Sequence, residues 1–294
     1  MNFRVLLGFV VSILMVPVQA MAQSAPDDIS SHAIDVELRA VTDQRTRGIS
    51  DSLLRPGAKL SIQAAHESGL IGLVEAATVS KKQFQGSNGL ALTVAGGYRF
   101  GDPDAWHFGV GMAAEVLPGA RFDAPHGFDV ETFSPTTVRS TRYDTAFAVF
   151  EWGYGALEGR VMRVMSKNYR GISTGGVCGT LLSLSADPTR ALDCYARGDH
   201  GARGSWLFDL DYKIPLDGLT TLVLHVGHQR IAHFSEANYT DYRIGLTHRR
   251  WGFEWGIDWI DTHVKERTLF QTPDGDRLRD TARGRLVLSV ARRF

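Results

Sequence analysis

The stretch from Trp251 to Ile260 constrains the fold most, because large apolar residues alternate in it with small or acidic ones. The two parities are Trp251, Phe253, Trp255, Ile257 and Trp259 against Gly252, Glu254, Gly256 and Asp258. Successive side chains of a β-strand point to opposite faces, so the pattern predicts a strand with one apolar and one polar face. At helical spacing the large residues would scatter around the axis instead of forming a stripe.

The same alternation recurs in about eleven further stretches, which gives about twelve strands in total. We expect the others at 34–47, 58–64, 70–81, 90–100, 106–115, 143–152, 157–167, 206–214, 222–227, 242–247 and 286–294. The alternation does not settle which face is which in 70–81, 143–152 and 157–167.

The connections between these strands alternate in length, and the longest are the polar segments at about 118–140, 168–204 and 263–280. A closed antiparallel barrel with an even number of strands puts alternate connections on opposite rims. Short periplasmic turns and longer extracellular loops are typical of transmembrane barrels. The sequence therefore predicts an all-β fold, a closed antiparallel transmembrane β-barrel of about 12 strands with both termini on the periplasmic side.

Three features favour an apolar face that points outward to lipid. The expected strands have the length of membrane-crossing strands, aromatic residues lie near their ends, and charges are spread over the polar parity of many strands. That parity would then face a watery lumen. The candidate lumen-lining residues are Asp35, Glu37, Arg39, Lys59, Arg99, His107, Glu115, Asp209, Asp211, Lys213, His225, Arg243, Glu254, Asp258 and Arg285.

The first residues are typical of an exported precursor. Arg4, an apolar run from Val5 to Val18 and an Ala-Met-Ala site before Gln23 predict a signal peptide over 1–22, which leaves the barrel at 23–294. Export and a barrel together predict a bacterial outer-membrane location, reached with the secretion and barrel-assembly machinery. The 32 basic and 32 acidic residues balance, which removes the electrostatic case for a nucleic-acid partner.

Two cysteines, Cys178 and Cys194, lie within the second long segment. Exported proteins retain disulfides, so we expect the two to be bonded, although two unrelated buried thiols are the alternative. Closing this loop would stabilise it by about 3 kcal/mol in the chain-entropy model.

Several motifs resemble those of known outer-membrane barrels. Phe294 ends an alternating strand, which is similar to their C-terminal assembly signal. The stretch from Thr42 to Ser50 (TDQRTRGIS) resembles the first-hairpin motif of the TorF family, a proteobacterial family of unknown function to which a porin role is ascribed. His66-Glu67-Ser68-Gly69 and Tyr239-Thr240-Asp241-Tyr242 are similar to that family at corresponding places. The resemblance implies a barrel and a pore, and it supplies no catalytic or ligand residues.

These observations predict a channel for passive diffusion of small polar solutes, with no enzymatic activity, cofactor or metal. A non-conducting barrel that works through its long loops is the second hypothesis. The third is a lipid hydrolase, because His233 and Ser235 have the spacing of a base and a nucleophile on one strand face, as do His66 and Ser68 in a turn. Solute, charge preference and association into homo-oligomers stay open. Arg47-Gly-Ile-Ser50 also recurs as Arg170-Gly-Ile-Ser173, which hints at a duplicated half.

Overall fold

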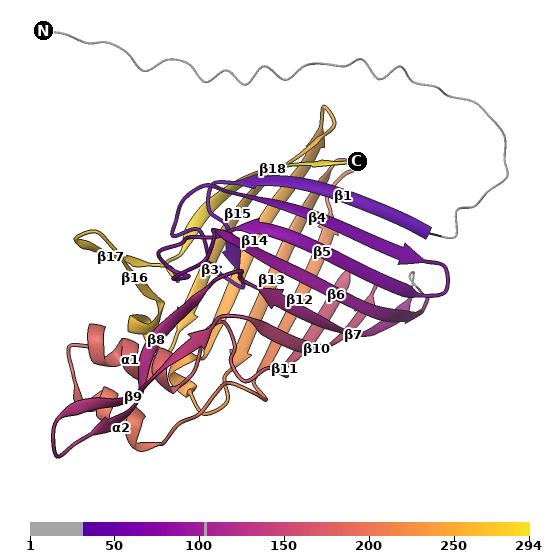
Figure 1. Ribbon diagram of the computed structural model, residues 1–294. Coiled ribbons are helices and arrows are strands. Elements are labelled where there is room, and N and C mark those ends of the chain that lie inside the picture. Colours follow the sequence, from indigo (N-terminus) through magenta and orange to yellow (C-terminus); the bar gives the residue numbers. More distant parts are fainter. Residues whose placement is uncertain (1–31, 103–104) are drawn as a thin grey trace, which may run out of the picture. The chain divides into compact units, whose positions relative to one another are not determined.

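The computed structural model describes residues 32–102 and 105–294, so the expected signal peptide lies outside the described residues. Twelve antiparallel strands form a closed barrel in which β1 pairs with both β4 and β18 (Figure 1). This confirms the predicted fold class. The barrel strands are β1 (His32–Val41), β4 (Gly57–His66), β5 (Leu70–Thr78), β6 (Leu90–Gly101), β7 (Trp106–Val116), β10 (Thr145–Tyr154), β11 (Leu157–Val164), β12 (Trp206–Pro215), β13 (Thr220–Arg230), β14 (Tyr239–Arg250), β15 (Phe253–Val264) and β18 (Arg285–Arg293).

The strand register puts the apolar parity on the outside of the barrel. In β15, Trp255, Ile257 and Trp259 are 46%, 42% and 51% exposed, while Glu254 and Asp258 on the other parity face the interior. The neighbouring strands continue this apolar outer surface, for example with Ile244 opposite Trp259 and Leu288 opposite Ile257. A belt of exposed apolar side chains around the wall is the inverse of a water-soluble barrel, whose apolar residues fill the interior.

The two rims of the barrel differ. Short connections such as 67–69, 155–156 and 251–252 lie at one rim, here called the turn end, and the long segments lie at the other, the loop end. Aromatic rings gather on the outer wall near the turn end. The ring centroids of Trp106 and Tyr154 are 5.0 Å apart, and those of Phe100 and Phe108 are 5.8 Å apart.

The long segments contain ordered structure of their own, although the sequence suggested only polar loops. The first is a hairpin of β8 (Arg121–Asp129) and β9 (Ser134–Arg142), and the second holds α1 (Thr174–Leu184) and α2 (Thr189–Ala196). The loop end also carries η1 (Ser235–Ala237), η2 (Arg267–Phe270), β16 (Gln271–Asp274) and β17 (Arg277–Asp280). Among the described residues, no helix has the length and apolarity needed to cross a membrane.

The α1–α2 segment shares an apolar core with the loop end of the barrel. Phe147, Val164 and Leu207 point inward from the wall and belong to one buried cluster with Val177 and Leu181 of α1. Interior positions near this segment are therefore apolar instead of charged. This explains why alternation could not assign the faces of the strands at 143–152 and 157–167.

Several strand boundaries differ from the prediction, and two of the differences have a clear physical cause. The first barrel strand ends at Val41, not near Arg47, because the chain there leaves the wall. Trp251 lies in the turn before β15 with φ 56° and is 75% exposed, so it does not belong to the strand that it appeared to begin. A two-residue turn of this kind needs positive φ at both central positions, and Gly252 supplies the second.

A disulfide joins Cys178 in α1 to Cys194 in α2, the pairing that the sequence predicts. Both residues are at most 1% exposed and lie inside the apolar cluster. Ser173 caps α1 by accepting a hydrogen bond from the backbone N–H of Gly176. The disulfide thus connects α1 and α2 directly, and no barrel strand takes part in it.

Replacing Cys178 and Cys194 with serine should loosen the helical segment and leave the barrel intact. The expected cost is about 3 kcal/mol, confined to 168–204, because the strand ladder does not depend on the bond. Limited proteolysis should cut the variant within this segment, while its heat-modifiable mobility on gels matches wild type. Wild type treated with a reductant should behave like the variant, and loss of the folded gel form would contradict the prediction.

Candidate functional site

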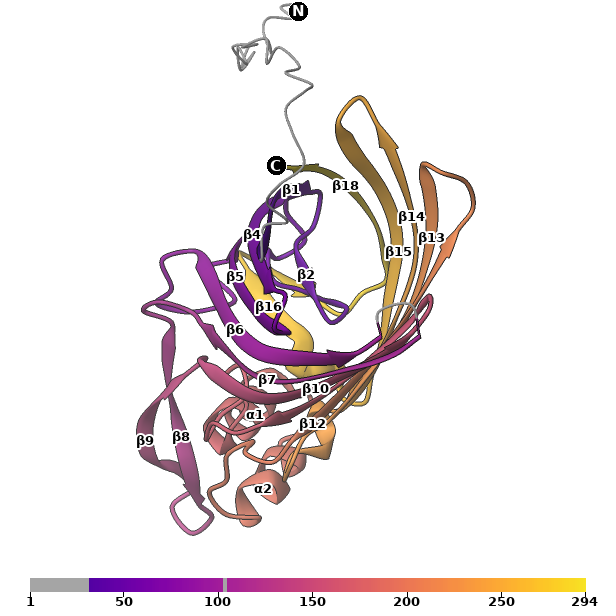
Figure 2. The same ribbon diagram turned by 90° about the vertical axis from the view of Figure 1, so that its right-hand side faces the viewer.

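Residues 42–56 turn into the barrel directly after β1 and form a hairpin of β2 (Arg45–Thr46) and β3 (Ile49–Ser50). Figure 2 shows β2 inside the ring of barrel strands. Thr42 still pairs with the last strand, since its N–H donates to the Leu288 carbonyl at 3.0 Å. The stretch that resembles the TorF motif therefore builds this inner hairpin.

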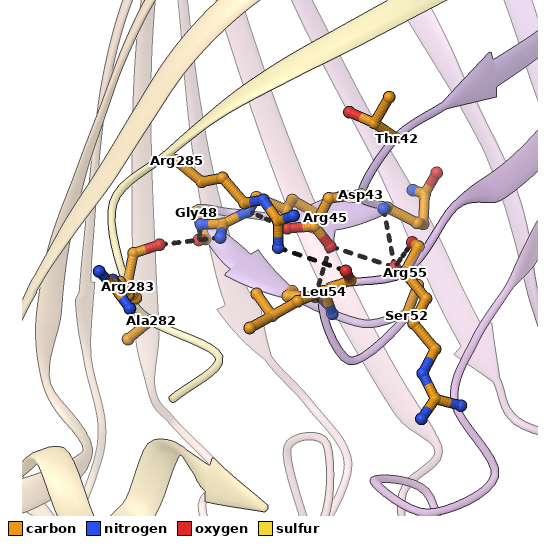
Figure 3. A network of polar contacts seen from close by, with 12 residues as sticks. Thr42, Asp43, Arg45, Gly48, Ser52, Leu54, Arg55, Ala282, Arg283 and Arg285 are labelled. Atoms are coloured by element: carbon orange, nitrogen blue, oxygen red, sulfur yellow. Dashed lines mark hydrogen bonds and ion pairs between the residues drawn. The ribbon is translucent and has the colours of Figure 1, made fainter. Parts of the chain in front are cut away.

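Asp43 is the centre of the hairpin's own hydrogen bonds. Its carboxylate accepts from Ser50 Oγ at 2.5 Å, from Ser52 Oγ at 3.1 Å and from Arg45 Nε at 2.8 Å, and Asp43 is only 1% exposed. Arg45 then donates to the carbonyls of Gly48 and Arg283, at 2.7 and 2.8 Å (Figure 3). These bonds fix the hairpin's shape and tie it to the segment that leads into β18.

The tip of the hairpin touches the opposite wall, and a glycine makes this approach possible. Arg47 and Gly48 have φ of 49° and 76°, as a two-residue type I′ turn requires. A Cβ on Gly48 would lie 2.3 Å from Thr262 Oγ1 and 2.5 Å from Asp241 Cβ, on the inner faces of β15 and β14. Only glycine lets the tip pack this closely.

Arg47 anchors the tip to the far side of the barrel. Its guanidinium forms an ion pair with Asp209 on β12 and donates to the carbonyls of Phe208 and His228, at 3.2 and 3.0 Å. β12 is the fifth strand from β1 in the order of the closed sheet. The hairpin therefore spans the interior from one wall to the other.

Arg170 holds the hairpin from the loop end. Its Nη2 lies 2.8 Å from Asp51 Oδ1 and 3.4 Å from Glu115 Oε1 on β7. Arg170 and Gly171 form the same kind of turn as Arg47 and Gly48, with φ of 47° and 84°. The two Arg-Gly-Ile-Ser copies of the sequence thus supply two arginines to one constriction.

The predicted lumen residues all lie on the interior parity of their strands, and most of them are paired. Arg39 contacts Glu37 at 2.8 Å and Glu254 at 2.9 Å. Further pairs join charged groups of the wall, either on adjacent strands or across one intervening strand. They are Lys59 with Glu75 at 3.0 Å, Arg99 with Glu151 at 3.7 Å, Lys213 with Glu158 at 2.7 Å, His225 with Asp211 at 3.0 Å and Asp241 at 3.1 Å, and Arg243 with Asp211 at 3.7 Å and Asp258 at 3.9 Å.

Three predicted residues stand apart from these pairs. Arg285 donates to the carbonyl of Leu54, at 3.3 Å, and so supports the hairpin (Figure 3). Asp35 lines the cavity near the turn end. His107 Nδ1 is buried and has no hydrogen-bond partner among the described residues, and its ring packs against Gly153.

Sequence reasoning missed several interior charges, namely Asp43, Asp51 and Arg170 in the loops and Glu75, Glu151, Glu158, Arg160 and Asp241 on strands. The strand residues other than Asp241 come from β5, β10 and β11, whose facing the alternation left open. The repeated Arg-Gly-Ile-Ser was the one signal for the arginines of the constriction.

Two cavities lie on either side of the hairpin and share no lining residue. The cavity toward the turn end has a volume of about 370 Å³ and is lined by Asp35, Gln63, Arg99 and Glu151 among others. The cavity at the loop end has a volume of about 450 Å³, and Ile49 and Asp51 of the hairpin form part of its lining. The interior therefore holds two separate cavities, one toward each end of the barrel.

Neither His-x-Ser pair lies along one barrel strand, where the two-residue period would place a base and a nucleophile side by side. His233 stacks on His200 with centroids 4.3 Å apart, and Ser235 accepts from Lys265 Nζ at 2.8 Å. His66 Nδ1 lies 2.8 Å from Ser68 Oγ but also accepts from the Ser68 backbone N–H, in an exposed turn. Within residues 32–102 and 105–294, no group of three or more His, Cys, Asp or Glu side chains is arranged to hold a metal.

The fold and the interior define a closed β-barrel protein with a charged, hairpin-constricted lumen. Residues 25–294 match the family described as "Bacterial protein of unknown function (Gcw_chp)", and the chain belongs to this family. The search of curated proteins found no match. Among solved structures, the chain is similar to the KdgM porin, at 9% identity over 88% of this chain and 99% of that one with a TM-score of 0.44. It is also similar to the NanC porin, at 9% identity over 88% and 98% with a TM-score of 0.44.

Changing Gly48 to alanine should undock the hairpin tip, because the new Cβ would overlap Thr262 and Asp241. Gly275→Ala is the matched control, since Gly275 also has positive φ, 66°, but nothing lies within 4 Å of its Cβ position. Positive φ alone costs an alanine about 1 kcal/mol of the free energy of unfolding. We expect Gly48→Ala to lose clearly more than this amount. Urea unfolding of the detergent-refolded barrel measures the free energy of unfolding of both variants. Equal losses of stability in Gly48→Ala and Gly275→Ala would contradict the packing argument.

Asp274 clamps the β16–β17 hairpin to two neighbouring loops. The hydrogen bond from Lys82, together with the nearby Arg55 at 3.0 Å and Arg279 at 3.2 Å, lowers the pKa of Asp274 to about 2. The ordinary pKa of an aspartate is 3.8, so the folded state favours the charged form of Asp274 more than the unfolded state does. The clamp therefore stabilises the loop end above about pH 4, and it is lost as the pH falls toward about 2.

Pepsin can test this clamp because it works in acid and the segment offers Leu269 and Phe270 as cleavage sites. We expect slow cutting of wild type near pH 4 and rapid cutting near pH 2. Asp274→Asn should be cut rapidly at both. Asp276→Asn, in the same hairpin, serves as the control and should behave as wild type. Identical rates for all three proteins near pH 4 would refute the clamp.

Proposed function

We propose that the protein is an outer-membrane channel of the TorF type, through which small polar solutes diffuse passively after removal of residues 1–22. The observation that carries the proposal is a hollow, charged interior inside a wall with an apolar outer surface. Charged side chains that line an aqueous passage set its selectivity. No enzymatic activity is proposed.

The outer wall supports the membrane location. Barrel strands of 8 to 12 residues match the length that a tilted strand needs to cross a bilayer. Exposed aromatic residues occur at both ends, with Trp106 and Tyr154 near the turn end and Trp206 near the loop end. Interfacial aromatic belts have this arrangement. The turn end would face the periplasm, and the long segments would face outward.

The C-terminus supports assembly by the barrel machinery. Phe294 is 68% exposed, and its backbone N–H donates to the Val36 carbonyl of β1 at 2.9 Å. The terminal aromatic residue therefore lies at the seam between the first and last strands, where its ring is available from outside.

A conducting lumen is supported by the volumes on both sides of the hairpin. A small barrel filled by its own side chains would leave no such space. The lining charges have both signs and are mostly paired, which fits a passage for small polar solutes without a strong net field. The narrowest part would lie at Arg47, Arg170 and their carboxylate partners.

The hairpin itself favours a second candidate, a non-conducting barrel that acts through its loops. Arg47 joins it to β12, and Arg170 joins Asp51 to β7 three strands away; a hairpin held this firmly would keep the passage closed. Single-channel recording separates the two candidates.

Mature protein refolded into a planar bilayer should give discrete current steps, and the reversal potential in a salt gradient gives the charge preference. Arg47→Ala should enlarge the steps. Arg47 and Asp209 side chains are 10% and 9% exposed, so removing one partner of this pair costs about 3–5 kcal/mol of hairpin docking.

Arg277→Ala is the control for this experiment, because Arg277 is an exposed arginine on β17 and no ion pair joins it to the described residues 42–56. Its conductance should equal that of wild type. A barrel that is folded by heat-modifiability but silent, both as wild type and as Arg47→Ala, would exclude the channel and favour the loop-binding candidate.

A further inference from the structure

The cavity at the loop end has the features of a ligand site as well as of an entrance. Its volume of about 450 Å³ is within the range of about 300–1,000 Å³ that is typical of small-molecule sites. The hairpin forms its floor, α1 forms one side, and the loop around Gln83 and the segment around Phe270 form others. A solute would occupy this space before it reaches the constriction.

The charges that reach this cavity are already neutralised by partners in the protein. Arg170 forms ion pairs with Asp51 and Glu115, and these three side chains are at most 12% exposed. Lys82, at the rim, is bonded to Asp274. A charged ligand would have to separate one of these pairs, which is costly in a buried setting. The cavity therefore favours an uncharged ligand.

Aromatic side chains stand on two walls of the cavity. On one wall Tyr143 packs against Phe84 and Phe122, with both centroid distances 5.3 Å. On the other wall Tyr239 meets Phe270 edge to face, at 5.5 Å. These mutual contacts hold the rings in fixed orientations. Fixed aromatic rings suit the C–H faces of a cyclic ligand.

One polar group in the lining lacks a partner. Gln83 Oε1 is buried, and it accepts no hydrogen bond from any described residue. An unpaired buried acceptor costs about 1–3 kcal/mol, and a ligand hydroxyl would satisfy it once the Gln83 amide turns toward the cavity that this residue lines. The ligand should therefore be a hydrogen-bond donor as well as a ring.

We propose that the loop-end cavity binds a neutral, hydroxyl-rich ring compound, a saccharide of one or two rings, with a hydroxyl donated to Gln83 Oε1. The inference deepens the proposed channel function, since it names the class of solute. Binding in detergent does not require conduction, so the two proposals can fail separately.

The test is calorimetric titration of the mature, oxidised protein with maltose, sucrose and trehalose, in a detergent that has no sugar headgroup. We expect a dissociation constant of about 1 mM or tighter for at least one of them. Glucose 6-phosphate should bind more weakly than glucose. No heat with any of the three disaccharides, or preference for the phosphate, would overturn the proposal.

Two variants locate the site. Gln83→Leu removes the acceptor and should weaken binding about two- to tenfold. Phe270→Ala removes one aromatic wall and should weaken binding without acting on the hydrogen bond. Thr132→Val, on the exposed tip between β8 and β9, is the control and should leave binding unchanged. Each variant is first checked for the folded gel form, and unchanged binding in either folded site variant would refute the assignment.

Bilayer recording completes the test. If the channel conducts, the bound disaccharide added at the loop end should reduce the current more in wild type than in Gln83→Leu. Binding without conduction would overturn the channel and keep the saccharide site. Conduction without saccharide binding would overturn the saccharide site and keep the channel.

Discussion

The requirement that buried charges be paired governs the interior of this protein. Arg47 and Arg170 lie in largely desolvated surroundings, where an unpaired charge is costly and an ion pair is stable only with good geometry. Asp209 and Asp51, with Glu115, meet that requirement, and each lies on a different element. Asp209 on β12 and Glu115 on β7 belong to the wall, whereas Asp51 belongs to the hairpin segment, so satisfying the charges also fixes where the hairpin crosses the barrel.

The hairpin gives the barrel a structure that a ring of strands lacks. Twelve strands enclose more space than short side chains can fill, and here the chain supplies its own backbone to occupy part of it. Asp43 keeps that inserted backbone rigid, and Gly48 allows it to touch the far wall. What stays open is two chambers with different linings, charged toward the turn end and partly aromatic at the loop end.

The wall could be predicted from sequence, whereas the constriction could not. Alternation is a local pattern. It therefore predicts that Trp255, Ile257 and Trp259 share one face of the strand, without information from the rest of the chain. It failed in 143–167, where Phe147 and Val164 face inward but pack under α1. The hairpin has a polar, turn-forming sequence that also suits an exposed loop. Its position depends on Asp209, which is 162 residues from Arg47, and no short-range pattern contains that information.

The place where the hairpin leaves the wall also matters for how the ring is joined. It follows β1, and its supports at Thr281, Arg283 and Leu288 belong to the last strand or its approach. The inner hairpin thus connects β1 to β18 and its preceding segment, where the first and last strands of the barrel meet. Contacts of such high sequence separation form late in folding. The full set of hairpin contacts is therefore complete only once the final strand lies beside the first.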